Sequence, residues 1–325
     1  MNEENGQLLK VKNLEVVIPT ARGTVRALNQ VDLHQEYGEN VGLVGESGAG
    51  KSMLGRAIMG LLPYPARVAG GEIRWNGESL LNKPARELRK LLSREIAMVF
   101  QDPISALNPL QKIGNQIIEA ILLHQRVSKS KAVEQTVKML AAVGLPLPEV
   151  HFHNFPHQYS GGMRQRVMIA LALINNPRLV VADEPTTALD VTIQAQILML
   201  LKRLQEERRM SVLLITHDLG VVAQFCSRIY VMYAGRMVES ADTKDIFHRP
   251  LHPYTRALLL SAVRRDGLKG RLTTIPGIMP DLIDMPAGCA FHPRCDRRAE
   301  RCGREAPVWC EVDPGHWAAC FNIGG

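Results

Sequence analysis

The stretch that decides the fold is Gly45-Glu46-Ser47-Gly48-Ala49-Gly50-Lys51-Ser52. It matches the phosphate-loop pattern G-x-x-x-x-G-K-[ST], in which glycines let backbone N–H groups converge on phosphate oxygens at the start of a helix. In such a loop Lys51 reaches the β- and γ-phosphates, and the Ser52 hydroxyl binds Mg²⁺. The loop therefore predicts a nucleoside-triphosphate site.

Apolar runs on both sides place this loop in an α/β unit. Residues 8–18 and 40–44 are apolar and β-branched, which predicts strands, and residues 52–62 have helical spacing. Further strands are predicted at 96–100, 179–182, 212–216 and 229–232, and further helices at 114–142, 164–174 and 194–208. Short apolar strands alternating with helices indicate an α/β fold with a mostly parallel sheet covered on both faces.

The order of elements also predicts the domain organisation. Residues from about 103 to 167 contain no good strand and are interpreted as a helical subdomain inside the nucleotide-binding domain, 1–250. After Pro250 the composition shifts to proline, glycine, arginine and cysteine, which predicts a small Cys-rich C-terminal extension over 251–325.

Two acidic residues end the apolar run 179–182. Asp183 is expected to hold Mg²⁺, directly or through water, and Glu184 to polarise the attacking water as general base. Two solvated acids at a strand end are the alternative, which the upstream phosphate loop disfavours.

A second anion-binding pattern, Ser160-Gly161-Gly162, stands before a predicted helix about 20 residues ahead of these acids. Two phosphate-binding loops on the same nucleotide would be redundant. We therefore expect each loop to serve a different nucleotide across a dimer interface.

Together these motifs resemble the ATP-binding subunits of ABC transporters over residues 8 to about 250. The resemblance is carried, in chain order, by the phosphate loop, Gln101, Ser160-Gly161-Gly162, Asp183-Glu184, Ala188-Leu189-Asp190 and His217. It implies a P-loop ABC ATPase fold that binds ATP and Mg²⁺.

The resemblance also implies roles for single residues. Gln101 would link the Mg²⁺ site to the helical subdomain that touches the membrane partner, Asp190 would communicate between the two nucleotide sites, and His217 would contact the γ-phosphate. Catalysis would then use Glu184, His217 and Gln101, with Ser52, Gln101 and Asp183 at the Mg²⁺. Family members usually stack an aromatic residue on adenine, but the matching position here is Ile18, so we expect aliphatic contact.

Three further motifs, at residues 100–109, 252–255 and 275–277, resemble the oligopeptide, dipeptide and nickel importer branch, and within it the first ATPase subunits of dipeptide importers. This resemblance implies an ATPase subunit that powers import of peptides, with nickel complexes, glutathione and antimicrobial peptides as other cargoes. The implied partners are a second homologous ATPase subunit in a heterodimer, two integral membrane permease subunits and an extracytoplasmic substrate-binding protein. The chain would lie peripherally on the cytoplasmic face of the cell membrane.

Composition argues against other classes of protein. The net charge of +7 is scattered without a basic block, so no nucleic-acid partner is predicted. The longest apolar run, 167–174, is shorter than the roughly 20 residues of a membrane span, and the polar residues 1–6 predict no secretory signal. Soluble ABC ATPases that act on DNA carry a long coiled coil, and no sustained heptads appear here. Those that act on ribosomes carry two cassettes, and this chain has one. Non-hydrolysing homologues would be expected to lack Glu184 or His217, and both are present.

Five of the six cysteines crowd the C-terminal end, and only Cys226 stands apart. Clustered thiols in a chain without an export signal indicate a metal or cluster site rather than disulfides. Spacing alone leaves open Zn²⁺, with His292 or His316 as further ligands, and reduced surface thiols. The family resemblance implies a [4Fe–4S] cluster at Cys289, Cys295, Cys302 and Cys320, with Cys310 as the spare thiol.

Overall fold

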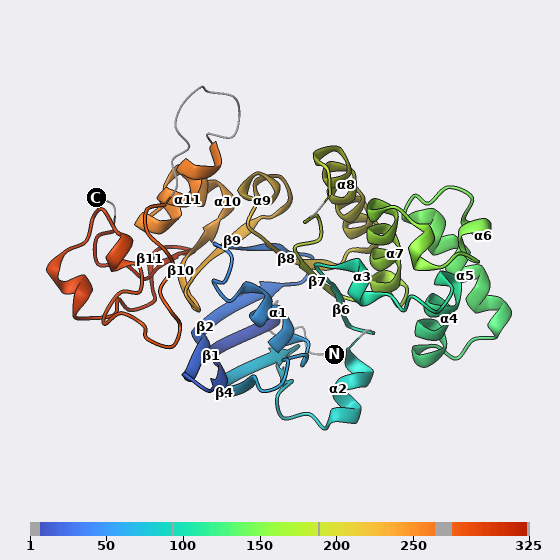
Figure 1. Cartoon of the computed structure of the whole chain (residues 1–325), viewed down its shortest axis with the longest axis horizontal. Coiled ribbons are helices and arrows are strands. Elements are labelled where there is room, and N and C mark those ends of the chain that lie inside the picture. The colour runs from blue at the N-terminus through green and yellow to red at the C-terminus, as the bar shows by residue number, and fades with distance from the viewer. Residues whose placement is uncertain (1–6, 93, 188, 264–274, 324–325) are drawn as a thin grey trace. The chain divides into compact units, whose positions relative to one another are not determined.

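The computed structural model describes residues 7–92, 94–187, 189–263 and 275–323. It divides into two compact units, the first formed by Met1–Asn82 and Leu214–Gly325 and the second by Lys83–Leu213 (Figure 1). Residues 1–6 and Ala188 lie outside the described residues. The division into 1–250 and 251–325 stays a prediction.

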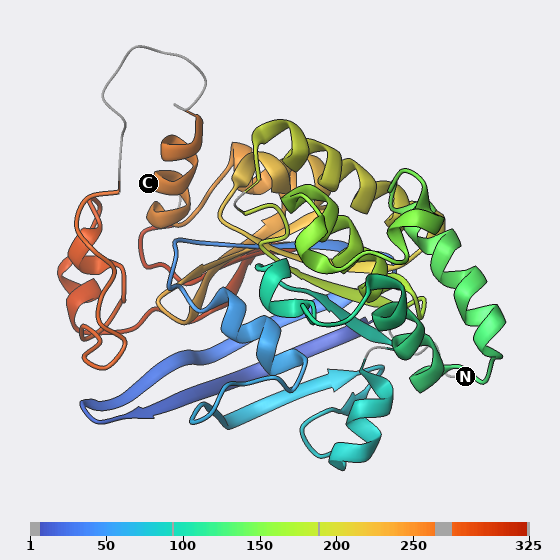
Figure 2. The same cartoon turned by 45° about the vertical axis from the view of Figure 1, so that its right-hand side comes forward.

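The first unit begins with an antiparallel sheet that the sequence analysis did not predict. Its strands are, in spatial order, β2 (Gly23–Glu36), β1 (Gln7–Thr20), β4 (Arg67–Trp75) and β5 (Glu78–Ser79). Strands β1 and β2 are long and lie side by side as a hairpin, the two darker blue strands of Figure 2. Only β1 matches a predicted strand, because β2 and β4 interleave buried and exposed positions with several charged residues.

A second sheet of the first unit carries the nucleotide motif. Strands β3 (Asn40–Val44) and β9 (Arg228–Tyr233) pair in parallel, as predicted. Antiparallel strands extend the sheet beyond β9, namely β10 (Arg236–Asp242), β12 (His316–Ala318) and β11 (Cys310–Asp313). The sheet was expected to be mostly parallel but is mixed, since β10 pairs antiparallel with β9 and the hairpin of β11 and β12 adds to β10.

Short helices complete the first unit. They are α1 (Lys51–Ile58), α9 (Leu219–Phe225), α10 (Thr243–His248) and α11 (Pro253–Val263). Helix α1 begins at Lys51, within the phosphate loop and one residue before the predicted start, and ends four residues earlier than predicted. Strand β8 (Ser211–Thr216) runs across the division between the two units.

The second unit is mainly helical. Its fully buried strands β6 (Ile96–Val99) and β7 (Leu179–Asp183) pair in parallel. The helices are α2 (Ala85–Leu91), α3 (Pro103–Ala106), α4 (Ile113–His124), α5 (Lys129–Ala142), α6 (Pro148–His151), α7 (Gly161–Leu173) and α8 (Val191–Arg208). Between β6 and β7 the described residues contain no strand, as the periodicity predicted.

Among the described residues, no helix is both long enough and apolar enough to cross a bilayer.

One buried carboxylate anchors the C-terminal hairpin to the sheet. Glu239 of β10 is fully buried and accepts hydrogen bonds from the backbone N–H groups of Leu251 and His252, at 2.7 and 2.9 Å. The ring Nε2 of His316, in β12, donates to the same carboxylate at 2.8 Å. A buried carboxylate is stable only when such donors surround it, so Glu239 ties three chain segments together.

We predict that Glu239→Ala lowers the free energy of unfolding by about 3–5 kcal/mol, because it leaves three buried donors without an acceptor. Denaturant or thermal unfolding of the two proteins measures this. Glu300→Ala, which removes an exposed ion pair with Arg304, is the matched control and should cost less than about 1 kcal/mol. Equal losses for both variants would contradict the anchoring role.

Candidate nucleotide-binding motifs and cysteine pocket

The phosphate loop connects β3 to α1 and packs against two backbone segments of the first unit. Gly45 has φ of 155°, and a Cβ there would lie 2.2 Å from the carbonyl oxygen of Met232. Gly50 has φ of 107°, and its Cβ would lie 2.8 Å from the carbonyl oxygen of Ala27. Both conformations and both contacts exclude a side chain, so these glycines shape the loop.

Lys51 folds back over the loop that precedes it. Its side chain is buried, and Nζ donates hydrogen bonds to the carbonyl oxygens of Gly45 and Glu46, at 2.8 and 3.0 Å. The ammonium group is thus held inside the curve of the loop, and Ser52 follows half-buried in the first turn of α1. This arrangement concentrates positive potential where a phosphate group would bind.

Two other predicted site residues belong to the first unit. His217 is exposed and directly follows β8, while the next residue, Asp218, caps α9 by accepting from the N–H of Gly220 at 2.8 Å. Ile18 lies half-buried in β1, opposite Val25 of β2.

In the second unit, the end of β7 brings the predicted residues Gln101 and Glu184 together. Asp183 is buried at the end of the strand, and Glu184 follows with φ of 45°, a left-handed conformation that is rare outside glycine. The Glu184 Oε2 accepts from Nε2 of Gln101 at 3.1 Å and from the hydroxyl of Thr187 at 2.8 Å. Gln101 and Glu184 were predicted, whereas Thr187 was missed because a threonine in a turn carries no sequence signal of its own.

The Ser-Gly-Gly motif begins α7 in the second unit. Ser160 is the N-cap, and its Oγ accepts from the N–H of Met163 at 3.4 Å. Asp190 caps α8 in the same way through the N–H of Ile193, at 3.0 Å. A Cβ on Gly162 would lie 2.7 Å from Cγ2 of Ile193, so the two helix starts pack closely only because residue 162 is glycine.

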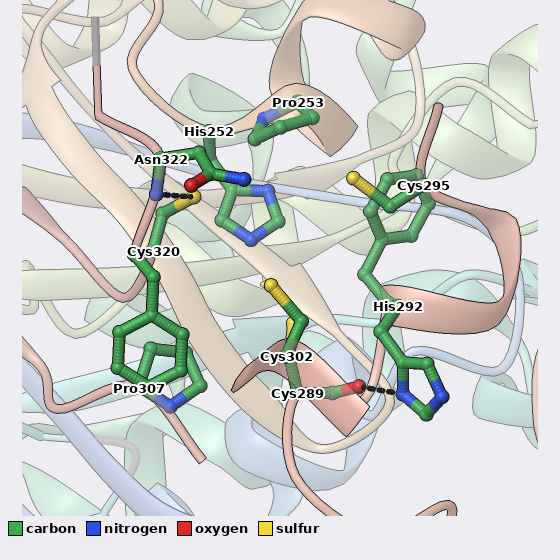
Figure 3. A pocket seen from close by; sticks show the side chains of 11 residues that line it. His252, Pro253, Cys289, His292, Cys295, Cys302, Pro307, Cys320 and Asn322 are labelled. Atoms are coloured by element: carbon green, nitrogen blue, oxygen red, sulfur yellow. Dashed lines mark hydrogen bonds between the residues drawn. The ribbon is translucent and has the colours of Figure 1, made fainter. Parts of the chain in front are cut away.

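Four cysteines of the C-terminal segment line one pocket (Figure 3). They are Cys289, Cys295, Cys302 and Cys320. Cys310, in β11, is exposed and does not line this pocket. His292 lines it but donates from Nδ1 to the Cys289 carbonyl oxygen at 2.9 Å, and His316 is bound to Glu239 instead. Among the described residues, no group of three or more His, Cys, Asp or Glu side chains is arranged to hold a metal ion.

Two features of the pocket act on the ionisation of these thiols in opposite directions, namely burial and hydrogen bonding. Burial raises the pKa of Cys289 to about 11, and it also raises the pKa values of Cys295 and Cys320. The Sγ of Cys320 also accepts a hydrogen bond from the backbone N–H of Asn322 at 3.4 Å, which stabilises its thiolate.

Comparisons with known proteins agree with the motifs. A family model for the ABC transporter matches residues 28–187, and one for the oligopeptide/dipeptide transporter C-terminal region matches residues 238–302. The chain is 47% identical to the oligopeptide transport ATP-binding protein OppD of Escherichia coli K12, covering 97% of this chain and 93% of that protein. It is 46% identical to the dipeptide transport ATP-binding protein DppD of the same organism, over 96% of both chains.

Solved structures are similar as well. The ATP-binding cassette MJ0796, described as a dimer in a post-hydrolysis state bound to ADP and Pi, matches with a TM-score of 0.66 and 31% identity. The match covers 73% of this chain and 99% of that one. From its fold, its motifs and these relatives, the chain belongs to the ATP-binding subunits of the ABC transporter family, in the group that carries the oligopeptide/dipeptide transporter C-terminal region.

Proposed function

We propose that the chain binds and hydrolyses ATP to power the import of peptides across a membrane. The observation that carries the catalytic part is the placement of Glu184, whose carboxylate is held by Gln101 and Thr187 at the end of β7. The peptide cargo rests on the names of the relatives, which are oligopeptide and dipeptide transport ATP-binding proteins. Nickel complexes and glutathione are the alternative cargoes.

Nucleotide binding is assigned to the phosphate loop. Lys51 already places its ammonium group against the carbonyl oxygens of Gly45 and Glu46. The β- and γ-phosphates of ATP would replace these neutral acceptors with charged ones, and hydrogen bonds to charged acceptors are stronger. The oxygen donors of Ser52, Gln101 and Asp183 suit Mg²⁺, which prefers hard oxygen ligands, and the bound ion would neutralise charge on the phosphates.

Hydrolysis is assigned to Glu184 as general base. A water molecule attacks the γ-phosphorus, the bond from that phosphorus to the β–γ bridging oxygen breaks, and the proton of the water passes to the carboxylate. Gln101 and Thr187 donate to one oxygen of Glu184 and fix its direction. His217 is assigned to the γ-phosphate by its place in the family pattern.

A dimer is proposed for the working ATPase, with Ser160, Gly161 and Gly162 completing the nucleotide site of a partner subunit. Support comes from the motif itself, which starts α7 with an N-cap and exposes Ser160 and Gly161. The similar cassette MJ0796 is described as dimeric. We further propose a homologous second ATPase subunit, two permease subunits and an extracytoplasmic binding protein as partners, with this chain peripheral on the cytoplasmic membrane face.

For the C-terminal extension, we propose a structural [4Fe–4S] cluster on Cys289, Cys295, Cys302 and Cys320. Support comes from their shared pocket and from the backbone N–H of Asn322, which donates to Cys320 at 3.4 Å. The four thiolates would be the ligands of the cluster. The cluster would hold together a segment rich in proline and glycine.

The first prediction from the proposed function concerns the general base. Glu184→Gln should retain Mg·ATP binding but lose at least about 100-fold in turnover of the assembled complex, since the amide cannot accept the proton. Lys51→Ala is the contrast, because it should weaken nucleotide binding itself. Equilibrium binding and phosphate release measured on both variants separate the two roles, and a wild-type rate in Glu184→Gln would reject the assignment.

A second prediction concerns the dimer. Gly162→Asp should damage hydrolysis at the site built on the partner's phosphate loop, because the new side chain meets Ile193 and adds negative charge beside bound phosphate. Complexes that combine Gly162→Asp chains with a wild-type partner, assayed with one phosphate loop inactivated at a time, measure this. Crosslinking that places Ser160 next to nucleotide bound by its own Lys51 would show that the arrangement is wrong.

The third prediction concerns the cysteine pocket. Protein purified without oxygen should be brown and contain about four irons per chain. Cys302→Ser should lose the colour, whereas Cys310→Ser should keep it, since Cys310 does not line the pocket. Colourless protein with one zinc per chain would contradict the cluster and leave the ATPase assignment intact.

A further inference from the structure

The phosphate loop carries a negative charge of its own. Glu46 is its second residue, directly after Gly45, and its side chain is 29% exposed. A carboxylate within a loop that binds an anion opposes that binding by like-charge repulsion. The loop therefore needs a positive charge that neutralises Glu46 without blocking the phosphate site.

Arg294, from the C-terminal segment, supplies this charge. Its guanidinium donates two parallel hydrogen bonds to Glu46, from Nη1 to Oε2 at 2.7 Å and from Nη2 to Oε1 at 3.0 Å. The arginine side chain is only 5% exposed, so water screens the pair weakly. These hydrogen bonds raise the pKa of Arg294 above its usual range, so its guanidinium stays charged at any physiological pH.

The arginine is itself held in place. Its Nε donates to the carbonyl oxygen of Pro276 at 2.8 Å, and its guanidinium carbon lies 5.8 Å from the centre of the Tyr233 ring. Because the guanidinium makes two hydrogen bonds to Glu46 and a third to Pro276, its orientation is fixed. Arg294 is therefore preorganised toward Glu46 rather than recruited from solvent.

Other residues beyond Pro250 contact the same loop. The hydroxyl of Tyr254, a buried residue of the motif at 252–255, accepts a hydrogen bond from the backbone N–H of Glu46 at 2.8 Å. The methyl group of Met279 lies 3.3 Å from the position that a Cβ on Gly48 would occupy. The motif at 252–255, which the nucleotide chemistry does not use, thus contacts the phosphate loop directly, and the motif at 275–277 reaches it through Arg294.

We propose that Arg294 is a positioning residue for nucleotide binding, which acts by neutralising Glu46 and holding the phosphate loop in its binding conformation. This inference rests on the proposed ATP-binding function of the loop. The C-terminal segment then belongs to the nucleotide-binding apparatus of its own chain. Loss of Arg294 leaves the Glu46 carboxylate unpaired beside the bound phosphates, so the damage comes mainly from Glu46.

The test is the affinity of the full chain for Mg·ADP, titrated for the wild type and four variants. Arg294→Ala should bind about 10-fold more weakly, equivalent to about 1.4 kcal/mol. Arg294→Ala combined with Glu46→Gln should recover to within about threefold of wild type, because the repelling charge is gone. Arg294→Lys should keep most of the affinity, and Arg304→Ala, an exposed arginine of the same segment, should bind as wild type.

Salt gives a second readout. The deficit of Arg294→Ala should shrink at high ionic strength, because screening weakens repulsion between Glu46 and phosphate. Wild-type affinity in Arg294→Ala, or a double variant that binds no better than Arg294→Ala, would overturn the inference. If Arg294→Ala fails to fold, Arg294→Lys provides the readout instead, and a loss of affinity in Arg294→Lys equal to that of Lys51→Ala would overturn the inference as well. A wild-type chain that binds no Mg·ADP would overturn the proposed function first.

Discussion

The constraint on which the rest depends is the close approach of the phosphate loop to neighbouring backbone. Gly45 and Gly50 bring it within contact of the carbonyl oxygens of Met232 and Ala27, so the loop is clamped between β9 and β2. The Lys51 ammonium group is held against the carbonyl oxygens of Gly45 and Glu46 in the same loop. The fold of the first unit thus places a buried positive charge at the start of α1, and a helix start attracts phosphate.

The C-terminal segment makes more contacts with the rest of the first unit than its composition predicted. Glu239 anchors the terminal hairpin to β10 through buried hydrogen bonds, and Arg294 binds the carboxylate of Glu46. The cysteine pocket lies in the same segment, and Cys295 directly follows Arg294. A segment with few apolar residues is thus held by polar contacts and, in our proposal, by a cluster.

How much could be predicted from the sequence differs between elements. Strands at 40–44 and 179–182 were located to within one residue, since buried parallel strands are continuous apolar runs. Strands β2 and β4 were missed because their burial is irregular, and β11 and β12 because they are short. Motif residues were found by pattern, whereas Thr187 and Arg294 carry no local sequence signal. The contact of Arg294 with Glu46 joins residues 248 positions apart, so it appears only in the folded chain.

Hydrogen exchange of the loop tests the central claim, that residues 45–52 hold the nucleotide, most directly. The backbone amides of this stretch should exchange more slowly when Mg·ATP is added to the full chain, since phosphate oxygens accept their hydrogen bonds. Peptides covering the exposed helix α2 serve as the internal reference. Slower exchange over 45–52 relative to α2 would agree with the account, and unchanged exchange there with saturating Mg·ATP would contradict it.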